Sequence, residues 1–254
     1  MRRKAALFML FLMVAGALQP PSFATEAPQP PFAWRAVYHT YASMQEELEG
    51  LQASHPDLVR VESIGTTYEG RDIWAVKLSD DVGTNDTTEP DVLVFGAIHA
   101  REVMGVEVPM FVLNYLIDGY GINETLTKYV NTKEIWFVPM LNPDGHVYIE
   151  QGNDWRRNRR PTTGGNIGVD LNRNWGYQFG VDGATSDDPA SEVYHGPYAF
   201  SENETVALRQ RRQSEQRKQI HRQNENQAAL GANDPLPKPH RGKNQQQRLD
   251  HRWN

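Results

Sequence analysis

The spacing of apolar residues along the chain predicts alternating helices and strands between residues 38 and 208. In the first segment apolar residues recur every three or four positions and stop before Pro56, which predicts an amphipathic helix. Its apolar positions are Tyr41, Met44, Leu48 and Leu51. Residues 58–65 and 71–79 then have the composition and alternation of two strands.

The following segments combine the patterns of buried strands and a helix. Residues 91–99, with the sequence DVLVFGAIH, are largely apolar and predict a central strand covered on both faces. Residues 106–121 have helical periodicity, with Pro109 in the first turn or at a kink. Residues 133–141 predict another buried strand, which ends at the turn signal NPDG at 142–145. This order predicts an α/β fold with a mixed, largely parallel central sheet flanked by helices.

The first 24 residues have the pattern of a secretory signal peptide. Three basic residues at 2–4 precede an apolar run at 5–18 and a small-residue cleavage site that ends at Ala24. A membrane anchor is the alternative, but the run is shorter than the roughly 20 residues that a bilayer span requires. We therefore expect export, cleavage near Ala24, and a secreted, soluble mature protein that does not bind membranes.

The composition limits the kinds of metal site and covalent chemistry that the chain can have. The chain has 254 residues, of which 39% are hydrophobic, and this is enough for one sizeable domain with a core. It contains no cysteine, which excludes a disulfide framework, a thiolate metal site and a cysteine nucleophile. Any metal ion would have to be held by histidine and carboxylate side chains.

Charge separates the body of the chain from its C-terminal segment. Residues 210–254 contain ten Lys or Arg and four Asp or Glu, whereas the preceding residues contain 16 and 28. This tail is rich in Gln, Asn and Arg and has too few apolar residues to offset its ordering entropy, so we expect disorder or at most a frayed helix. A nucleic-acid-binding tail is the alternative, but a solvated extension fits export better. Residues 25–37 form a Pro-rich linker.

Three ionisable residues directly follow the predicted strand at 91–99. In the sequence GAIHAREVMG they are His99, Arg101 and Glu102, at the carboxyl end of a strand, where functional residues collect in such sheets. The spacing lets a turn direct an imidazole and a carboxylate at one ion, although His-x-x-Glu alone is a weak signal. The acidic loop at 79–91 has enough carboxylates to hold calcium, but we favour a solvated loop.

Three further clusters come later in the chain, and each has an ordinary structural interpretation when it is taken alone. DWRRNRRP could be a solvated basic loop, GVDLNRNWG a turn rich in Asn and Asp, and YHGPY a satisfied histidine near an aromatic ring. The occurrence of all three clusters in one chain is a much more specific signal of function than any one of them alone. The residues concerned are Arg156, Arg157, Arg159, Arg160, Asp170, Asn172, Arg173, His195 and Tyr198.

Together these motifs make the chain resemble the zinc carboxypeptidase family, the group of carboxypeptidases A, B and T. The resemblance covers residues 38–208 and rests on TYEGRDIWAVKLSD, HARE, NPDG, WRRNR, DLNRNW and YHG. It is most similar to the carboxypeptidase T branch. The resemblance implies a zinc-dependent peptidase that removes C-terminal residues from peptides and proteins.

Carried over to this chain, the resemblance implies one Zn²⁺ ion bound by His99, Glu102 and His195, with a water molecule in the fourth position. A His₂Glu set with one open position is the ligand pattern of catalytic zinc in carboxypeptidase A. The resemblance also makes Asp170 the hydrogen-bond partner of His99. Such a partner fixes the tautomer of a ligating histidine.

The resemblance gives the arginines separate roles. Arg173 and Asn172 match the residues that bind the substrate's C-terminal carboxylate, a group that guanidinium can bind through two hydrogen bonds. Arg159 matches the arginine that stabilises the oxyanion. Arg101, Arg156 and Tyr198 match outer substrate-binding residues. Arg157 and Arg160 match none of these positions, and we expect them to be solvated charges.

Two departures from the family pattern divide the functional hypotheses. Only the linker separates the signal peptide from the catalytic resemblance, so we expect no pro-domain, and the resemblance stops near residue 209. We expect the general-base glutamate to be absent, because Glu204, Glu215 and Glu225 lie in contexts that do not match it.

One hypothesis is a metallocarboxypeptidase truncated or frameshifted near 209, with little activity. The alternative is a non-catalytic zinc protein that binds peptide C-termini, and nucleic-acid binding is disfavoured. We expect a monomer.

Overall fold

The computed structural model describes residues 38–86 and 88–213. The predicted signal peptide, the Pro-rich linker and residues 214–254 of the predicted tail lie outside the described residues. No helix in the described part is long and apolar enough to cross a membrane.

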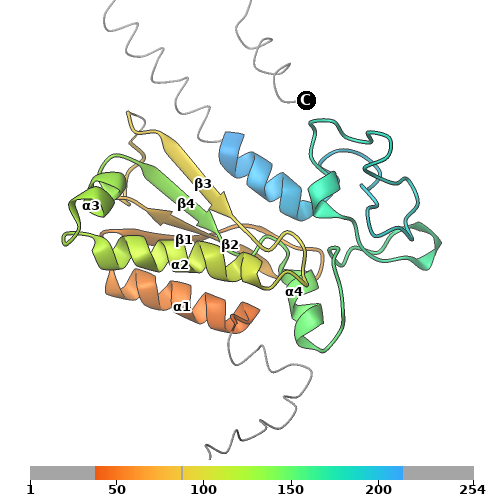
Figure 1. Cartoon of the computed structure of the whole chain (residues 1–254), viewed down its shortest axis with the longest axis horizontal. Coiled ribbons are helices and arrows are strands. Elements are labelled where there is room, and N and C mark those ends of the chain that lie inside the picture. Colours follow the sequence, from red (N-terminus) through yellow and green to blue (C-terminus); the bar gives the residue numbers. More distant parts are fainter. Residues whose placement is uncertain (1–37, 87, 214–254) are drawn as a thin grey trace, which may run out of the picture. The chain divides into compact units, whose positions relative to one another are not determined.

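Four strands form one mixed sheet in the spatial order β1-β2-β4-β3 (Figure 1). Strand β1 pairs antiparallel with β2, β2 pairs antiparallel with β4, and β3 pairs parallel with β4. The sheet therefore confirms the predicted α/β fold with a mixed sheet. The strands are β1 (Val59–Thr66), β2 (Asp72–Leu78), β3 (Asp91–Phe95) and β4 (Glu134–Val138).

The prediction of a largely parallel sheet with a central third strand is wrong for the described strands. A five-residue link joins β1 to β2, and such a short link permits only an antiparallel pair. The parallel pair arises where two helices separate β3 from β4. Within the described sheet β3 lies at an edge, and Val92 and Phe95 are both exposed. Within the described residues β3 is therefore not covered on both faces.

Helices cover one face of the sheet and form the larger core with it. Helix α1 (Tyr41–Ser54) begins at a capping box in which Thr40 and Ser43 satisfy each other's backbone N–H groups. Helices α2 (Met104–Gly119) and α3 (Glu124–Val130) connect β3 to β4. Pro109 lies in the interior of α2 and is buried. The core side chains include Met44, Leu48, Val76, Leu78, Val106, Met110, Leu113 and Phe137.

A helix at residues 203–213, drawn in blue in Figure 1, packs against the opposite face of the sheet. Its Ala207 and Leu208 join a second core with the β2 and β4 side chains that point to this face. A Cβ atom on Gly65 would lie 3.0 Å from the Cβ of Ala207, so glycine allows this close approach. The helix continues four residues past the expected boundary at 209, and Arg211 stacks 3.3 Å above the ring of Trp136.

The NPDG sequence begins a helix instead of forming the predicted turn. Helix α4 (Pro143–Glu150) has Asn142 as its N-cap, with a side chain that accepts a hydrogen bond from the Gly145 N–H, and proline occupies the first helical position. A Cβ on Gly145 would lie 2.7 Å from the Arg157 carbonyl oxygen. This glycine therefore lets the arginine-rich segment approach α4 closely.

The turn that follows β3 is compact because two glycines meet across it. A Cβ on Gly96 would overlap the carbonyl oxygen of Gly105. Between them Ala97 has a left-handed conformation, with φ of 49°, which is uncommon for a residue other than glycine. The Glu102 N–H donates to the His99 carbonyl at 3.2 Å, so the turn places both side chains at one end of the sheet.

Candidate metal centre

Four polar side chains meet where the turn after β3 approaches the segment around Asp170. The Nδ1 atom of His99 lies 3.0 Å from Oε1 of Glu102, and its Nε2 atom lies 3.0 Å from Oδ1 of Asp170. Arg156 donates to Oδ2 of Asp170 at 3.1 Å and lies 3.6 Å from Glu102. The structure therefore brings together four of the residues that the sequence predicted for the site.

Asp170 is fully buried, and its surroundings favour the charged carboxylate. Burial alone would raise its pKa, but the hydrogen bond from His99 and the charge of Arg156 outweigh that effect and hold the pKa of Asp170 below its usual value. Asp170 also caps the short 3₁₀ helix η3 (Leu171–Arg173) by accepting from the Asn172 N–H. These contacts fix the carboxylate in one orientation behind His99.

The contacts of His99 suit the binding of a metal cation between His99 and Glu102. A carboxylate acceptor at Nε2 requires a proton on that atom, which in neutral imidazole leaves a lone pair on Nδ1. That lone pair faces the carboxylate of Glu102 at 3.0 Å. Two acceptors repel each other at this distance unless a proton or a metal ion lies between them. Imidazole nitrogen and carboxylate oxygen are both zinc ligands, and the donor chemistry of this pair therefore fits Zn²⁺.

His195 does not join this pair in the described structure. Its Nε2 atom lies 3.0 Å from Oδ1 of the exposed Asp187, and its Nδ1 atom lies 2.6 Å from the carbonyl oxygen of Gly196. The ring centroid of Phe179 is 4.5 Å from that of His195. The described residues contain no group of three His, Asp or Glu side chains placed to hold one metal ion. The predicted three-ligand set is thus incomplete in this arrangement.

The arginine that the sequence assigned to the oxyanion lies between aromatic rings. The guanidinium of Arg159 lies 3.7 Å from the ring centroid of Tyr148 and 4.9 Å from that of Trp155. Its Nε atom is 3.6 Å from a carboxylate oxygen of Glu69. Arg101 has two partners of its own, at 3.6 Å from Asp154 and 3.3 Å from Glu192.

The predicted carboxylate-binding residues follow Asp170 directly. Arg173 donates from Nε to the Ala184 carbonyl at 2.7 Å and from Nη1 to the neighbouring Asn172 carbonyl. The Asn172 side chain is exposed. Tyr198 is also exposed, and its carbonyl accepts a hydrogen bond from Asn174. These side chains are accessible, but no contact joins them to His99 or Glu102 in the described structure.

The expectation that Arg157 and Arg160 are solvated charges is wrong. Arg157 is buried and donates to the carbonyl groups of Pro189 and Ser191. Arg160 forms a 2.6 Å ion pair with the buried Glu202. The sequence showed only a run of positive charge, because the acceptors come from a segment about 30 to 40 residues later.

Sequence reasoning also missed Asn158, Glu202 and Glu204, which are all buried together. Asn158 is the fourth residue of the WRRNR motif, in which the arginines are the conspicuous signal. From the sequence, Glu204 is weighed only as a general base, and its burial beside Glu202 and Asn158 is not predicted. The clue was its position two residues after Glu202, which places both carboxylates at the start of one helix.

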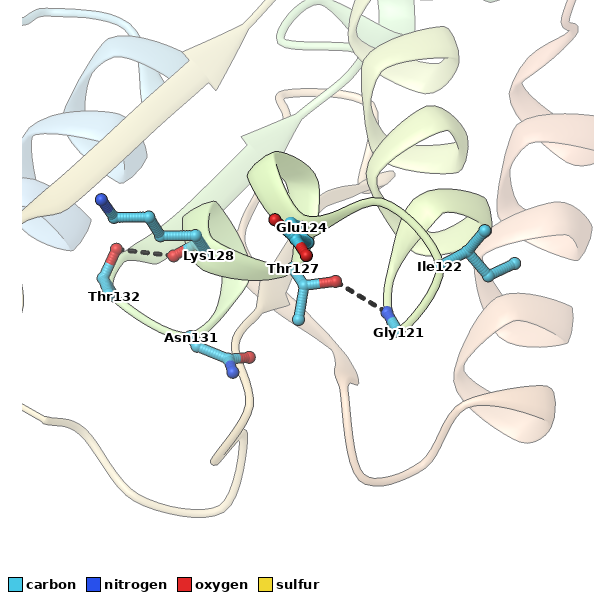
Figure 2. Close-up of a pocket in the computed structure, with 7 residues that line it drawn as sticks. All are labelled: Gly121, Ile122, Glu124, Thr127, Lys128, Asn131 and Thr132. Atoms are coloured by element: carbon cyan, nitrogen blue, oxygen red, sulfur yellow. Dashed lines mark hydrogen bonds between the residues drawn. The ribbon is translucent and has the colours of Figure 1, made fainter.

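Two other features carry no metal chemistry. At the acidic loop, the Lys77 ammonium donates to the Thr84 and Asp81 carbonyls and lies 2.5 Å from Glu134. These oxygens face a lysine, so they give the possible calcium site no support. A hollow of about 500 Å³ lies beside α3 (Figure 2). Its lining includes Glu124 and Lys128 as charged residues and lacks histidine.

Comparison with known proteins decides the family. The model that describes zinc carboxypeptidases matches residues 44–226. The chain belongs to the zinc carboxypeptidase family. A zinc carboxypeptidase of Saccharothrix mutabilis subsp. capreolus is 44% identical over 149 residues, which are 58% of this chain and 34% of that protein. Human carboxypeptidase A1 is 37% identical over 175 residues, 68% of this chain and 41% of that protein.

Solved structures support the same family. Carboxypeptidase A of Helicoverpa armigera has a TM-score of 0.62 and 30% identity, over 68% of this chain and 42% of that chain. Thrombin-activatable fibrinolysis inhibitor has a TM-score of 0.63 and 26% identity, over 68% of this chain and 43% of that chain. The chain spans 34–43% of the length of these relatives, and its assignment to the carboxypeptidase T branch stays a prediction.

Proposed function

We propose that this chain is part of a zinc-dependent metallocarboxypeptidase, which hydrolyses C-terminal peptide bonds of peptides and proteins. The observation that carries the proposal is the His99–Glu102 pair with the buried Asp170 behind it. Membership of the zinc carboxypeptidase family supports the choice of metal and reaction. In the proposal the protein is exported and takes peptide C-termini and no nucleic acid as its partners.

In this proposal His99, Glu102 and His195 hold one zinc ion. Zinc at such a site polarises a carbonyl group and lowers the pKa of a bound water. Asp170 keeps the proton on Nε2 of His99, so that Nδ1 remains available as a ligand. His195 has to leave Asp187 and turn toward His99, which exchanges its contact with a fully solvated carboxylate for the metal.

The arginines bind and orient the substrate in this proposal. Arg173 and Asn172 bind the terminal carboxylate, because a guanidinium can donate two parallel hydrogen bonds to it. Arg159 is held by Tyr148 and Trp155 and donates to the developing oxyanion. Arg101, Arg156 and Tyr198 contact the preceding residues of the peptide.

The direct test is zinc-dependent release of the C-terminal amino acid from a blocked dipeptide by the purified full chain. Release that is abolished by a chelator and restored by zinc supports the proposal. Glu102→Gln should remove both zinc and release, whereas Asp187→Asn should retain zinc, because Asp187 is not a proposed ligand. Release that persists without zinc would refute the assignment.

The alternative function is zinc-dependent binding of peptide C-termini without hydrolysis. It requires the metal ligands and the carboxylate-binding Arg173 and Asn172 but no general base, and in the described structure the acidic side chains that contact His99 are Glu102 and Asp170. Stoichiometric zinc with measurable affinity for a peptide, no released amino acid, and weaker affinity for the C-terminally amidated peptide would select this alternative.

A further inference from the structure

Asn174 holds residues 195–202, the His195 segment, which carries one of the proposed zinc ligands. Asn174 is 0% exposed. Its side-chain N–H₂ group donates to the carbonyl groups of His195 at 2.8 Å and Tyr198 at 3.1 Å, and to the Ser201 hydroxyl oxygen at 2.9 Å. One buried amide thus fixes the backbone at both residues of this segment that are predicted to act in the site.

The acceptor atoms of Asn174 bind the end of the same segment and the helix that follows it. Its Oδ1 atom accepts from the Glu202 N–H at 3.2 Å and from the Thr205 hydroxyl at 2.7 Å. Its backbone carbonyl accepts from the Phe200 N–H at 2.7 Å. Phe200 has a φ of 57°, a left-handed conformation that is rare for a bulky residue. Asn174 therefore holds the segment in a backbone conformation that is unfavourable without such contacts.

A glycine lets the amide of Asn174 come this close to the segment. Gly196 has a φ of 85°, and a Cβ atom there would lie 2.9 Å from Nδ2 of Asn174 and 2.5 Å from Oγ of Ser201. Any larger residue at this position would push the amide away from its acceptors. The sequence thus supplies both the amide and the space that it needs.

The backbone of Asn174 connects the His195 segment to the other half of the candidate site. Asn174 is the C-cap of η3, and Asp170 is the N-cap. Asp170 contacts Nε2 of His99 at 3.0 Å with its side chain and donates its backbone N–H to the Tyr194 carbonyl at 2.8 Å. One end of η3 therefore holds the residue before the His195 segment, and the other end holds the segment itself.

We propose that Asn174 is a positioning residue that sets the place of the His195 segment relative to η3 and His99. Its amide donates and accepts hydrogen bonds at the same time, which a carboxylate of the same shape cannot do. Asn174→Asp would place a negative oxygen against two backbone carbonyl oxygens and release the segment. The consequence for zinc rests on the proposed function, whereas the placement of the segment does not.

NMR of the metal-free full chain at one constant pH tests the placement. The ring resonances of His195 are assigned by their loss in His195→Ala. The ring centroid of Phe179 lies 4.5 Å from that of His195, so a displaced imidazole changes its ring-current shift. Asn174→Asp should move these resonances. Asn131→Asp, the same exchange at an exposed position, should leave them in place.

Thr205→Val provides a second, milder variant that adds no charge. It keeps the shape of the side chain and removes the hydrogen bond to Oδ1 of Asn174. The His195 resonances should move by a smaller amount than in Asn174→Asp. If Asn174→Asp does not fold, Thr205→Val alone decides. Resonances that stay in place in either folded variant would overturn the proposal.

Zinc affinity, measured by competition with a dye, separates this proposal from the proposed function. Asn174→Asp should weaken zinc binding by about 10- to 100-fold, the usual effect of losing an outer partner of a metal ligand. The double variant Asn174→Asp/His195→Ala should bind no more weakly than His195→Ala, because Asn174 acts through His195. A further loss in the double variant would contradict the positioning role. Equal affinity of His195→Ala and wild type, with displaced resonances in Asn174→Asp, would refute only the proposed ligand set.

Discussion

Asp170 is completely buried and accepts hydrogen bonds from His99, from Arg156 and from the backbone of Asn172. Each of these partners belongs to a different part of the predicted site. At the residue scale the organisation of the site therefore depends on a carboxylate that contacts no solvent. Its removal should affect the metal ligand more than the fold around it.

Asp170→Asn tests this dependence. The amide cannot hold the Nε2 proton of His99 as a charged acceptor does, so zinc affinity should fall by about 10- to 100-fold, the usual effect of losing such a partner. Competition against a zinc-binding dye measures the affinity. Asp182→Asn, which changes an exposed aspartate, should leave it unchanged. Equal affinity of wild type and Asp170→Asn would contradict the role of Asp170.

Glu204 should also make stability depend on pH. Its pKa rises from 4.5 to about 8 on folding, so the folded state binds more protons and the free energy of unfolding should fall as pH rises through this interval. The slope should approach about 1.4 kcal/mol per pH unit. The pKa of His39 is also raised, which adds a loss in the same direction. Urea unfolding at several pH values should show a flatter profile for Glu204→Gln, and parallel profiles would contradict it.

At the scale of elements, sequence periodicity predicted the bounds of those elements whose apolar residues share one buried face. Helix α1 and strands β1 and β2 were predicted close to their observed bounds, because their apolar faces point into one core. The same reasoning failed for β3, because an apolar run does not show how many neighbours a strand has. It failed for NPDG because those residues suit both a turn and a helix N-terminus.

The site could be predicted only where contacts are local in sequence. His99 and Glu102 lie three residues apart, so one turn brings them together. The pairing with Asp170 and the burial of Arg157 depend on contacts across roughly 30 to 70 residues, which come from family resemblance or not at all. The position of His195 against Asp187 had no signal in the sequence, because an exposed aspartate next to a histidine follows no motif.

Lys77 on β2 and Glu134 on β4 join two strands and the acidic loop through a buried ion pair. Both side chains are 1% exposed and their charged atoms lie 2.5 Å apart. Lys77→Met should lower the free energy of unfolding by about 3–5 kcal/mol, because Glu134 is left buried and unpaired. Lys77→Met combined with Glu134→Leu should lose less, because no charge remains buried. A double variant that is less stable than Lys77→Met would contradict this explanation, and chemical denaturation measures all three chains.

At the scale of the molecule, an apolar stripe on α2 has no cover in the described part of the chain. Met104, Val108, Phe111 and Tyr115 recur along the helix and are all more than half exposed, and Phe111 and Tyr115 stack on each other. An exposed apolar stripe along one helix favours association, whereas the sequence predicts a monomer.

Phe111→Lys tests the effect of this stripe. The wild-type chain should associate as its concentration rises, and Phe111→Lys should associate less, because a charge in the stripe opposes its burial. Light scattering after size-exclusion chromatography gives the mass of each form. Val181→Lys, a change at an exposed apolar residue outside α2, serves as the matched control and should associate as wild type does. A monomeric wild-type chain at all concentrations would contradict the prediction.

The account of the whole molecule depends on one zinc ion held by His99, Glu102 and His195. X-ray absorption spectroscopy at the zinc edge of the purified full chain tests this most directly. The account predicts one zinc per chain, with two imidazole nitrogens and carboxylate or water oxygens at about 2.0–2.2 Å. In His195→Ala the imidazole contribution should fall by half. A spectrum with one imidazole or none, or an identical spectrum in His195→Ala, would contradict the central claim.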